Sequence, residues 1–333
     1  MLFLLPLLAA CPGPSFMQDS QAPAPPLEGR AWLNTDHALT WEELRGQVVL
    51  LDFWTYCCIN CMHVIPDLAR LEEDFRDEPF LVIGVHSAKF EAEGDDRNIR
   101  QAILRYGVHH PVVVDEGMKI WRSFGVQSWP TLVLVGPEGN YLGFVTGEGQ
   151  YENLKAIIRE VLDKGREAGT LAEAPIRVKL EKRAPTRLTF PGKVHWFDGR
   201  LYVADSTANR VLEVDPSGGR VLRTFGSGEA GWKDGPADEA RFRNPQGMAG
   251  LEGALYVADT GSHAIRRIDL ESGAVTTIAG NGVKSEVYPP HPGLGTQTLL
   301  NSPWDLATDG RQLFVAMAGC HQLWSYDFES RRI

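Results

Sequence analysis

Two hydrophobic patterns alternate between residues 46 and 161. Continuous apolar runs at 48–53 and 80–85 are typical of strands that are buried on both faces of a parallel sheet. The stretch from Cys58 to Phe75 has apolar residues at helical spacing, which predicts a helix directly after the first run. Weaker patterns predict helices at 96–106, 119–124 and 150–162, a strand at 112–114 and a hairpin of 131–135 with 141–145. This order predicts an α/β fold with helices on both faces of the sheet.

The pattern changes after a charged, alanine-rich stretch at 166–184, which we interpret as a linker. Short strands and glycines follow, and the unit at 199–215 recurs at 253–269 and, more weakly, at 310–327. Repeats of this kind are typical of all-β propeller blades. We expect about three blades within 185–333, and therefore a partial propeller. The sequence thus predicts either a truncated gene product or completion of the ring by a second chain. Asp205 and Asp259 recur at the same position of the unit, which predicts structural turn caps.

The first residues have the pattern of an export signal. A short apolar run, Leu2 to Leu8, precedes Ala9, Ala10 and Cys11, and this order resembles the bacterial lipobox. Residues 1–11 are therefore predicted to be a lipoprotein signal peptide, with Cys11 lipidated and 12–30 a proline-rich tether. The expected location is extracytoplasmic, anchored to a bacterial membrane by lipid alone. No Lys or Arg precedes the run, so the alternative is a misassigned start and a cytoplasmic protein.

Composition narrows the classes of function. Lys and Arg number 33 against 43 Asp and Glu, and a net charge of −10 argues against a nucleic acid partner. No apolar run reaches the roughly 18 residues that a membrane-spanning helix needs. Of the five cysteines, Cys57, Cys58 and Cys61 fall within five positions. A disulfide scaffold spreads its cysteines along the chain, so this cluster indicates redox chemistry or metal binding.

The pair Cys58 and Cys61 has a specific placement. It follows a predicted buried strand and opens a predicted helix. The N-terminus of a helix stabilises a thiolate, and the thiolate is the attacking species in disulfide exchange. A cysteine three positions later lies on the same helix face, where it can resolve a mixed disulfide formed at the first. The spacing therefore indicates a dithiol/disulfide pair.

Three segments resemble known families. Residues 52–61 resemble the thioredoxin active-site segment, 124–132 resemble the cis-proline segment of that family, and 111–139 resemble its membrane-associated TlpA-type branch. The redox domain joined to the repeats resembles the thioredoxin-fused NHL-repeat proteins, which share the Cys-Cys-Ile-Asn-Cys form. This resemblance covers most of the chain from Ala31 and implies a thioredoxin-like domain at 31–165.

The resemblance also implies roles for individual residues. It implies that Cys58 is the nucleophile, Cys61 the resolving thiol and Asp52 the buried carboxylate that relays the Cys61 proton. Pro130 would follow a cis peptide bond and place the Trp129 backbone beside the active site. The aromatic residues Trp54, Tyr56 and Trp129 are expected to be pocket walls and core. Ile-Asn replaces the usual Gly-Pro, and Cys57 replaces the usual Trp, so the reduction potential and substrate remain open.

We therefore predict a thiol-disulfide oxidoreductase that acts on protein thiols and disulfides, uses a reductant partner, needs no cofactor and binds partners through its repeats. One alternative is a non-enzymatic propeller scaffold with a vestigial redox domain. Another is a Cu(I)-handling protein that uses Cys57 and Cys61, because Cu(I) prefers thiolates, although no His stands where such a site would need one. The sequence places no fourth zinc ligand and, with Met62 before His63, no haem attachment motif.

Overall fold

The computed structural model describes residues 15–16, 22–287 and 291–333. It divides into two compact units, with the boundary between Arg183 and Ala184. Cys11 and the predicted signal peptide lie outside the described residues. Among the residues that are described, no helix has the length and apolar character needed to cross a membrane.

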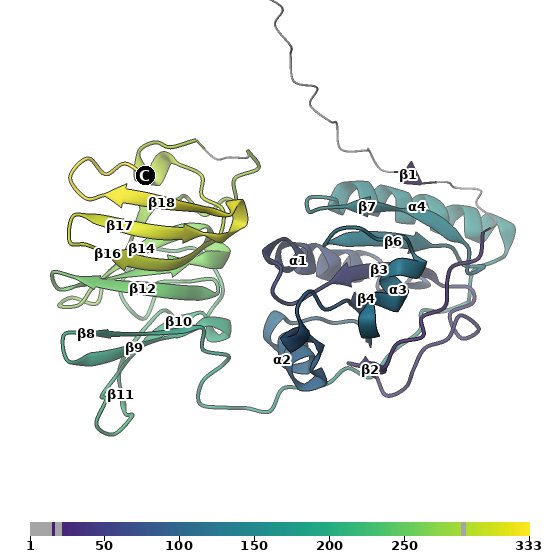
Figure 1. The fold of residues 1–333 in the computed structure, drawn as a ribbon, viewed down its shortest axis with the longest axis horizontal. Coiled ribbons are helices and arrows are strands. Elements are labelled where there is room, and N and C mark those ends of the chain that lie inside the picture. The colour runs from purple at the N-terminus through teal and green to yellow at the C-terminus, as the bar shows by residue number, and fades with distance from the viewer. Residues whose placement is uncertain (1–14, 17–21, 288–290) are drawn as a thin grey trace, which may run out of the picture. The chain divides into compact units, whose positions relative to one another are not determined.

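The first unit is built on one seven-stranded mixed sheet with the order β1-β7-β6-β3-β4-β5-β2 (Figure 1). Strand β3 pairs in parallel with β4 and antiparallel with β6, so it lies inside the sheet. The predicted strands are present, and two short strands, β1 and β2, add to the edges. The strands are β1 (Ser15–Phe16), β2 (Ala31–Leu33), β3 (Val48–Trp54), β4 (Phe80–His86), β5 (Val112–Val114), β6 (Thr131–Val135) and β7 (Tyr141–Thr146).

Helices cover both faces of this sheet, as predicted. Helices α1 (Ile59–Asp74) and α4 (Tyr151–Ala168) pack on the face that carries Val48 and Leu50. Helix α2 (Asp96–Tyr106) packs against Trp54 on that same face. The short helix α3 (Lys119–Ser123) covers the opposite face with Phe53. Alternation along β3 therefore points Asp52, like Leu50 and Trp54, toward α1.

The segments that the sequence analysis interpreted as a tether and a linker pack against the first unit. The backbone N–H of Ala24 donates to the Gly139 carbonyl (2.8 Å), and Leu27 is buried in the core. At the other end, the Ala172 N–H donates to the Gly46 carbonyl (2.9 Å), and Glu181 accepts a hydrogen bond from the Asn34 N–H (3.1 Å). Residues 22–30 and 170–181 find backbone and side-chain partners there, so the first unit extends beyond the predicted 31–165.

The second unit consists of three antiparallel sheets, which are the predicted blades. Each repeated unit supplies two neighbouring strands of one sheet, joined by a short 3₁₀ turn. The first sheet holds β8 (Lys193–Phe197), β9 (Arg200–Asp205), β10 (Arg210–Val214) and β11 (Val221–Phe225). The second holds β12 (Pro245–Leu251), β13 (Ala254–Asp259), β14 (Ala264–Asp269) and β15 (Val275–Ala279), and the third holds β16 (Pro303–Thr308), β17 (Gln312–Met317) and β18 (Gln322–Asp327).

The repeated aspartates are structural, as expected. Asp259 is fully buried, accepts the backbone N–H of Arg243 (2.7 Å) and pairs with the buried guanidinium of Arg266 (2.9 Å). Asp205 is equally buried and pairs with Arg210 (2.8 Å). Each carboxylate therefore ties the end of a strand to the chain segment that enters the same blade.

Equivalent positions of the three repeats differ in burial. Val211 and Ile265 are 0% exposed because each packs against the next blade, whereas Leu323 at the same repeat position is 86% exposed. On the opposite side of the stack, Met248 of β12 is buried, and the matching Val194 of β8 is 65% exposed. Within the described residues, the two outer blades of the second unit therefore each carry an exposed apolar side chain at a position that is buried in the inner blade.

The difference in burial between Ile265 and Leu323 allows a stability test with a matched control. We expect Ile265→Ala to lower the free energy of unfolding of the 333-residue protein by about 2–5 kcal/mol, because it opens a cavity between blades. Leu323→Ala removes an exposed side chain and is expected to change it by less than about 0.5 kcal/mol. Urea titration followed by tryptophan fluorescence measures both. Equal losses for the two variants would contradict the assigned packing.

Candidate active site

The dithiol lies at the turn from β3 into α1. Cys58 is the N-cap of α1, with extended backbone angles (φ −92°, ψ 112°), and its Sγ accepts the backbone N–H of Cys61 (3.3 Å). Cys58 is partly exposed, whereas Cys61 is 1% exposed and packs in the core. Both thiols are free. The sequence therefore places one thiol at the surface and the other beneath it.

The surroundings of Cys58 and Cys61 shift the pKa values of the two thiols in opposite directions. The hydrogen bond with the Cys61 side chain, helped by backbone N–H groups and by Lys89, lowers the pKa of Cys58 to about 7, against the effect of burial. Burial, the neighbouring Cys58 and the Asp52 carboxylate raise the pKa of Cys61. Near neutral pH, Cys58 is thus partly thiolate, whereas Cys61 retains its proton.

Asp52 lies in the core of the unit, near both cysteines. Burial raises its pKa to about 7; His110 opposes this rise and Cys58 adds to it. Oxygen Oδ1 of Asp52 has no hydrogen-bond partner among the described residues. Strand register sets Asp52 opposite Gly84, where the Trp54 and His110 side chains lie close to the glycine. The carboxylate is therefore a buried proton acceptor whose pKa lies close to neutrality.

Aromatic side chains surround the turn. The ring of Tyr56 stacks on His86 (5.6 Å between centroids), and the Trp129 indole N–H donates to the Ser87 carbonyl (3.1 Å). Both residues are partly exposed and pack, with Cys58, against the cluster that contains Cys61. Trp54 is 1% exposed in that same cluster. Tyr56 and Trp129 therefore lie partly exposed in the same cluster as Cys58, while Trp54 forms part of its core.

The segment around Pro130 lies at the same end of β3 as the cysteine pair. The peptide bond between Trp129 and Pro130 is cis, as the resemblance implied. Pro130 directly precedes β6, whose first residue, Thr131, pairs with Phe53 near the end of β3. The fold thus brings the predicted residues Asp52, Trp54, Tyr56, Cys58, Cys61, Trp129 and Pro130 to one end of β3.

The sequence analysis missed Glu93, which belongs to a 3₁₀ helix at Glu91–Gly94. It is 3% exposed and accepts hydrogen bonds from the Thr55 hydroxyl (2.8 Å) and the Cys57 backbone N–H (3.0 Å). The surrounding run EAEGDD holds four acidic residues, and nothing in it distinguishes Glu93 from Glu91. Only tertiary contact identifies the residue.

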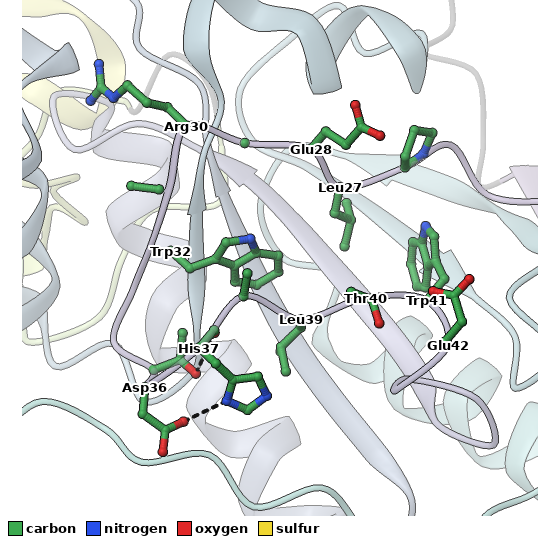
Figure 2. Close-up of a pocket in the computed structure, with 15 residues that line it drawn as sticks. Leu27, Glu28, Arg30, Trp32, Asp36, His37, Leu39, Thr40, Trp41 and Glu42 are labelled. Atoms are coloured by element: carbon green, nitrogen blue, oxygen red, sulfur yellow. Dashed lines mark hydrogen bonds and ion pairs between the residues drawn. The ribbon is translucent and has the colours of Figure 1, made fainter.

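A separate cavity of about 720 Å³ is lined by residues 26–32 and 35–42. Figure 2 shows Trp32, Leu39 and Trp41 along it, and none of the predicted site residues lines it. Within the described part of the chain, no group of three or more His, Cys, Asp or Glu side chains is arranged to hold a metal ion.

Comparison with known proteins supports the two-part organisation. A family model described as thioredoxin-like matches residues 46–141. Protein SUPPRESSOR OF QUENCHING 1, chloroplastic, from Arabidopsis thaliana is 44% identical over 306 residues, which are 89% of this chain and 29% of that protein. NHL repeat-containing protein 2 from Homo sapiens is 40% identical over 330 residues, which are 95% of this chain and 45% of that protein.

A third relative matches a shorter part of the chain. Thiol-disulfide oxidoreductase ResA from Bacillus anthracis is 27% identical over 120 residues, 36% of this chain and 66% of that protein. The chain spans less than half the length of the two longer relatives.

The raised pKa of Asp52 predicts a pH-dependent effect of Asp52→Asn on stability. An aspartate that titrates near 7 when folded and at 3.8 otherwise binds its proton more tightly in the folded state, so wild-type stability falls as pH rises between these values. We expect the variant to be more stable than the wild type by about 2–4 kcal/mol at pH 8 and nearly equal to it at pH 4. Urea titrations of the reduced proteins measure this difference. A difference that does not change with pH would contradict the buried, titrating carboxylate.

Proposed function

The chain joins a thioredoxin-like domain to NHL-type repeats, and on this premise we propose that it is a thiol-disulfide oxidoreductase acting on protein substrates. The observation that carries the proposal is the division between Cys58, whose pKa is lowered to about 7, and the buried Cys61, whose pKa is raised. In thiol-disulfide exchange, one thiolate attacks the substrate, and a second thiol stays protonated until it resolves the mixed disulfide. A structural cysteine pair has no need of this difference.

The first step uses Cys58. Its thiolate attacks one sulfur of a substrate disulfide, forms a mixed disulfide and releases the other substrate sulfur as a thiolate. The N-terminus of α1 and the backbone N–H of Cys61 stabilise the thiolate before attack. Tyr56 and Trp129, which are partly exposed and pack in the same cluster as Cys58, would contact the substrate chain, and the backbone before Pro130 would pair with it.

The second step needs a proton acceptor for Cys61. Asp52 takes the Cys61 proton, and the resulting thiolate attacks Cys58 Sγ, so the Cys58–Cys61 disulfide forms and the second substrate thiolate leaves. Two electrons pass from the dithiol to the substrate. A pKa of about 7 suits Asp52 to accept and return a proton near neutral pH. A thiol reductant, the proposed partner, then regenerates the dithiol by the reverse sequence.

The repeats supply a second part of the proposal, a protein-interaction platform. Their recurring carboxylates, Asp205 and Asp259, are buried in ion pairs. Apolar residues such as Trp196, which is 60% exposed on β8, are available to a partner protein.

Reduction of insulin by the purified protein, with dithiothreitol as the electron source, tests the redox proposal. We expect Cys58→Ser to abolish turnover. Reduced Cys61→Ser, freed of dithiothreitol before insulin is added, should accumulate a mixed disulfide through Cys58, because the resolving thiol is missing. Non-reducing mass spectrometry identifies that species. Cys320→Ser, a buried cysteine of the third blade, is the matched control and should retain activity. A wild type no faster than Cys58→Ser would favour the scaffold alternative.

We also propose a lipid anchor at Cys11. Lipidation at Cys11 would hold the protein at a membrane and place the dithiol in a compartment that permits disulfides. After expression in a bacterium, the wild type is expected in the membrane fraction and Cys11→Ala in the soluble extracytoplasmic fraction. A wild type confined to the cytosolic fraction would refute the anchor.

A further inference from the structure

Glu93 joins two segments beside the dithiol through both of its carboxylate oxygens. Oε1 accepts from the Thr55 hydroxyl and the Cys57 N–H, while Oε2 accepts from the backbone N–H groups of Lys89 (2.9 Å) and Phe90 (3.0 Å). Partial burial opposes ionisation, yet the hydrogen bonds from Cys57 and Thr55 lower the pKa of Glu93. A charged carboxylate is therefore fixed next to the third cysteine of the cluster.

Cys57 is the most exposed of the three clustered cysteines. Accessibility by itself would make it the most reactive of them. Its backbone N–H, however, donates to the Glu93 carboxylate, which therefore lies beside the thiol, and desolvation together with that carboxylate raises the pKa of Cys57 to about 12. A thiol in that state is a poor nucleophile.

We propose that Glu93 determines which cysteine reacts: its carboxylate, fixed beside Cys57, keeps that cysteine as a thiol, so that Cys58 alone attacks and Cys61 alone resolves. This inference deepens the proposed oxidoreductase function and rests on it for its biological purpose. Glu93 acts through Cys57 and is a positioning residue, since it does not touch the reacting sulfur atoms.

The competing reaction shows why such control matters. A Cys57 thiolate would attack a substrate disulfide, form a second mixed disulfide and release one substrate thiolate, with the same balance of electrons as the attack by Cys58. Cys61 packs in the core near Asp52, whereas Cys57 is exposed on the turn. A substrate held at Cys57 would therefore not be released by the resolving thiol.

The other charged and titratable groups near Cys57 do not replace Glu93. Lys89 favours the Cys57 thiolate, so it opposes the effect of the carboxylate. A Cys58 thiolate disfavours ionisation of Cys57, but Glu93 has the larger effect. The phenols of Tyr56 and Tyr106 also lie near Cys57 and are neutral near pH 8, because burial raises their pKa values. Glu93 is thus the group whose removal should change Cys57 most.

The test compares alkylation of each cysteine in the wild type and in Glu93→Gln. Reduced protein is treated with iodoacetamide between pH 6 and 10, and mass spectrometry measures the rate at each site. In the wild type we expect Cys58 to react fastest and Cys57 to remain slow. In Glu93→Gln we expect Cys57 to react at least about tenfold faster at pH 8, with its pH midpoint shifted downward. Thr55→Val removes one hydrogen bond but keeps the carboxylate, so Cys57 should stay slow.

A second measurement covers the case in which Glu93→Gln does not fold. The double variant Cys58→Ser, Cys61→Ser keeps Glu93 and isolates Cys57, which we expect to react at least about tenfold more slowly than a cysteine in an unstructured peptide. A peptide-like rate here, or an unchanged Cys57 rate in folded Glu93→Gln, would overturn the inference. Alkylation requires no turnover, so a protein inactive on insulin would refute the proposed function and still leave control of Cys57 by Glu93 measurable.

Discussion

Burial of strand β3 on both faces is the constraint on which the candidate active site depends. Every residue from Val48 to Trp54 is buried, so the strand has no freedom to shift its register. Its alternation sends Asp52 toward the face that α1 covers, and its end places the next turn at the edge of the sheet. The cysteine pair therefore has a fixed surface thiol, a fixed core thiol and a carboxylate below them.

Three cysteines within five positions acquire three different chemistries from this arrangement. The N-terminus of α1 stabilises the thiolate of Cys58, and Cys61 is buried away from solvent. Cys57 lies beside a carboxylate from another part of the chain. The differences are electrostatic, because the thiols themselves are identical. Charge and burial around each sulfur decide which one is a thiolate near neutral pH.

In the blades, the surroundings of an apolar residue decide whether it is buried by packing. Val211, Ile265 and Leu323 occupy one repeat position and are all apolar, yet only the first two meet a neighbouring blade. Their contribution to stability follows from what covers them and not from residue type. The buried pair of Asp259 with Arg266 adds polar links between turns, and it tolerates burial because its oxygens and most of its N–H groups are matched.

Local patterns in the sequence determined much of this protein. The apolar run at 48–53, the helical spacing after Cys58 and the repeated blade unit predicted the α/β domain, the placement of its dithiol and the blades, because short-range periodicity reports which face of an element is buried. The resemblance of residues 52–61 and 124–132 to thioredoxin segments then identified the α/β domain as thioredoxin-like. The positions of Glu93 beside Cys57 and of His110 near Asp52, and the packing of residues 22–30 and 170–181, were decided by the tertiary structure alone. Those contacts join residues far apart in the chain, and no local pattern records which distant segment will lie beside a given side chain.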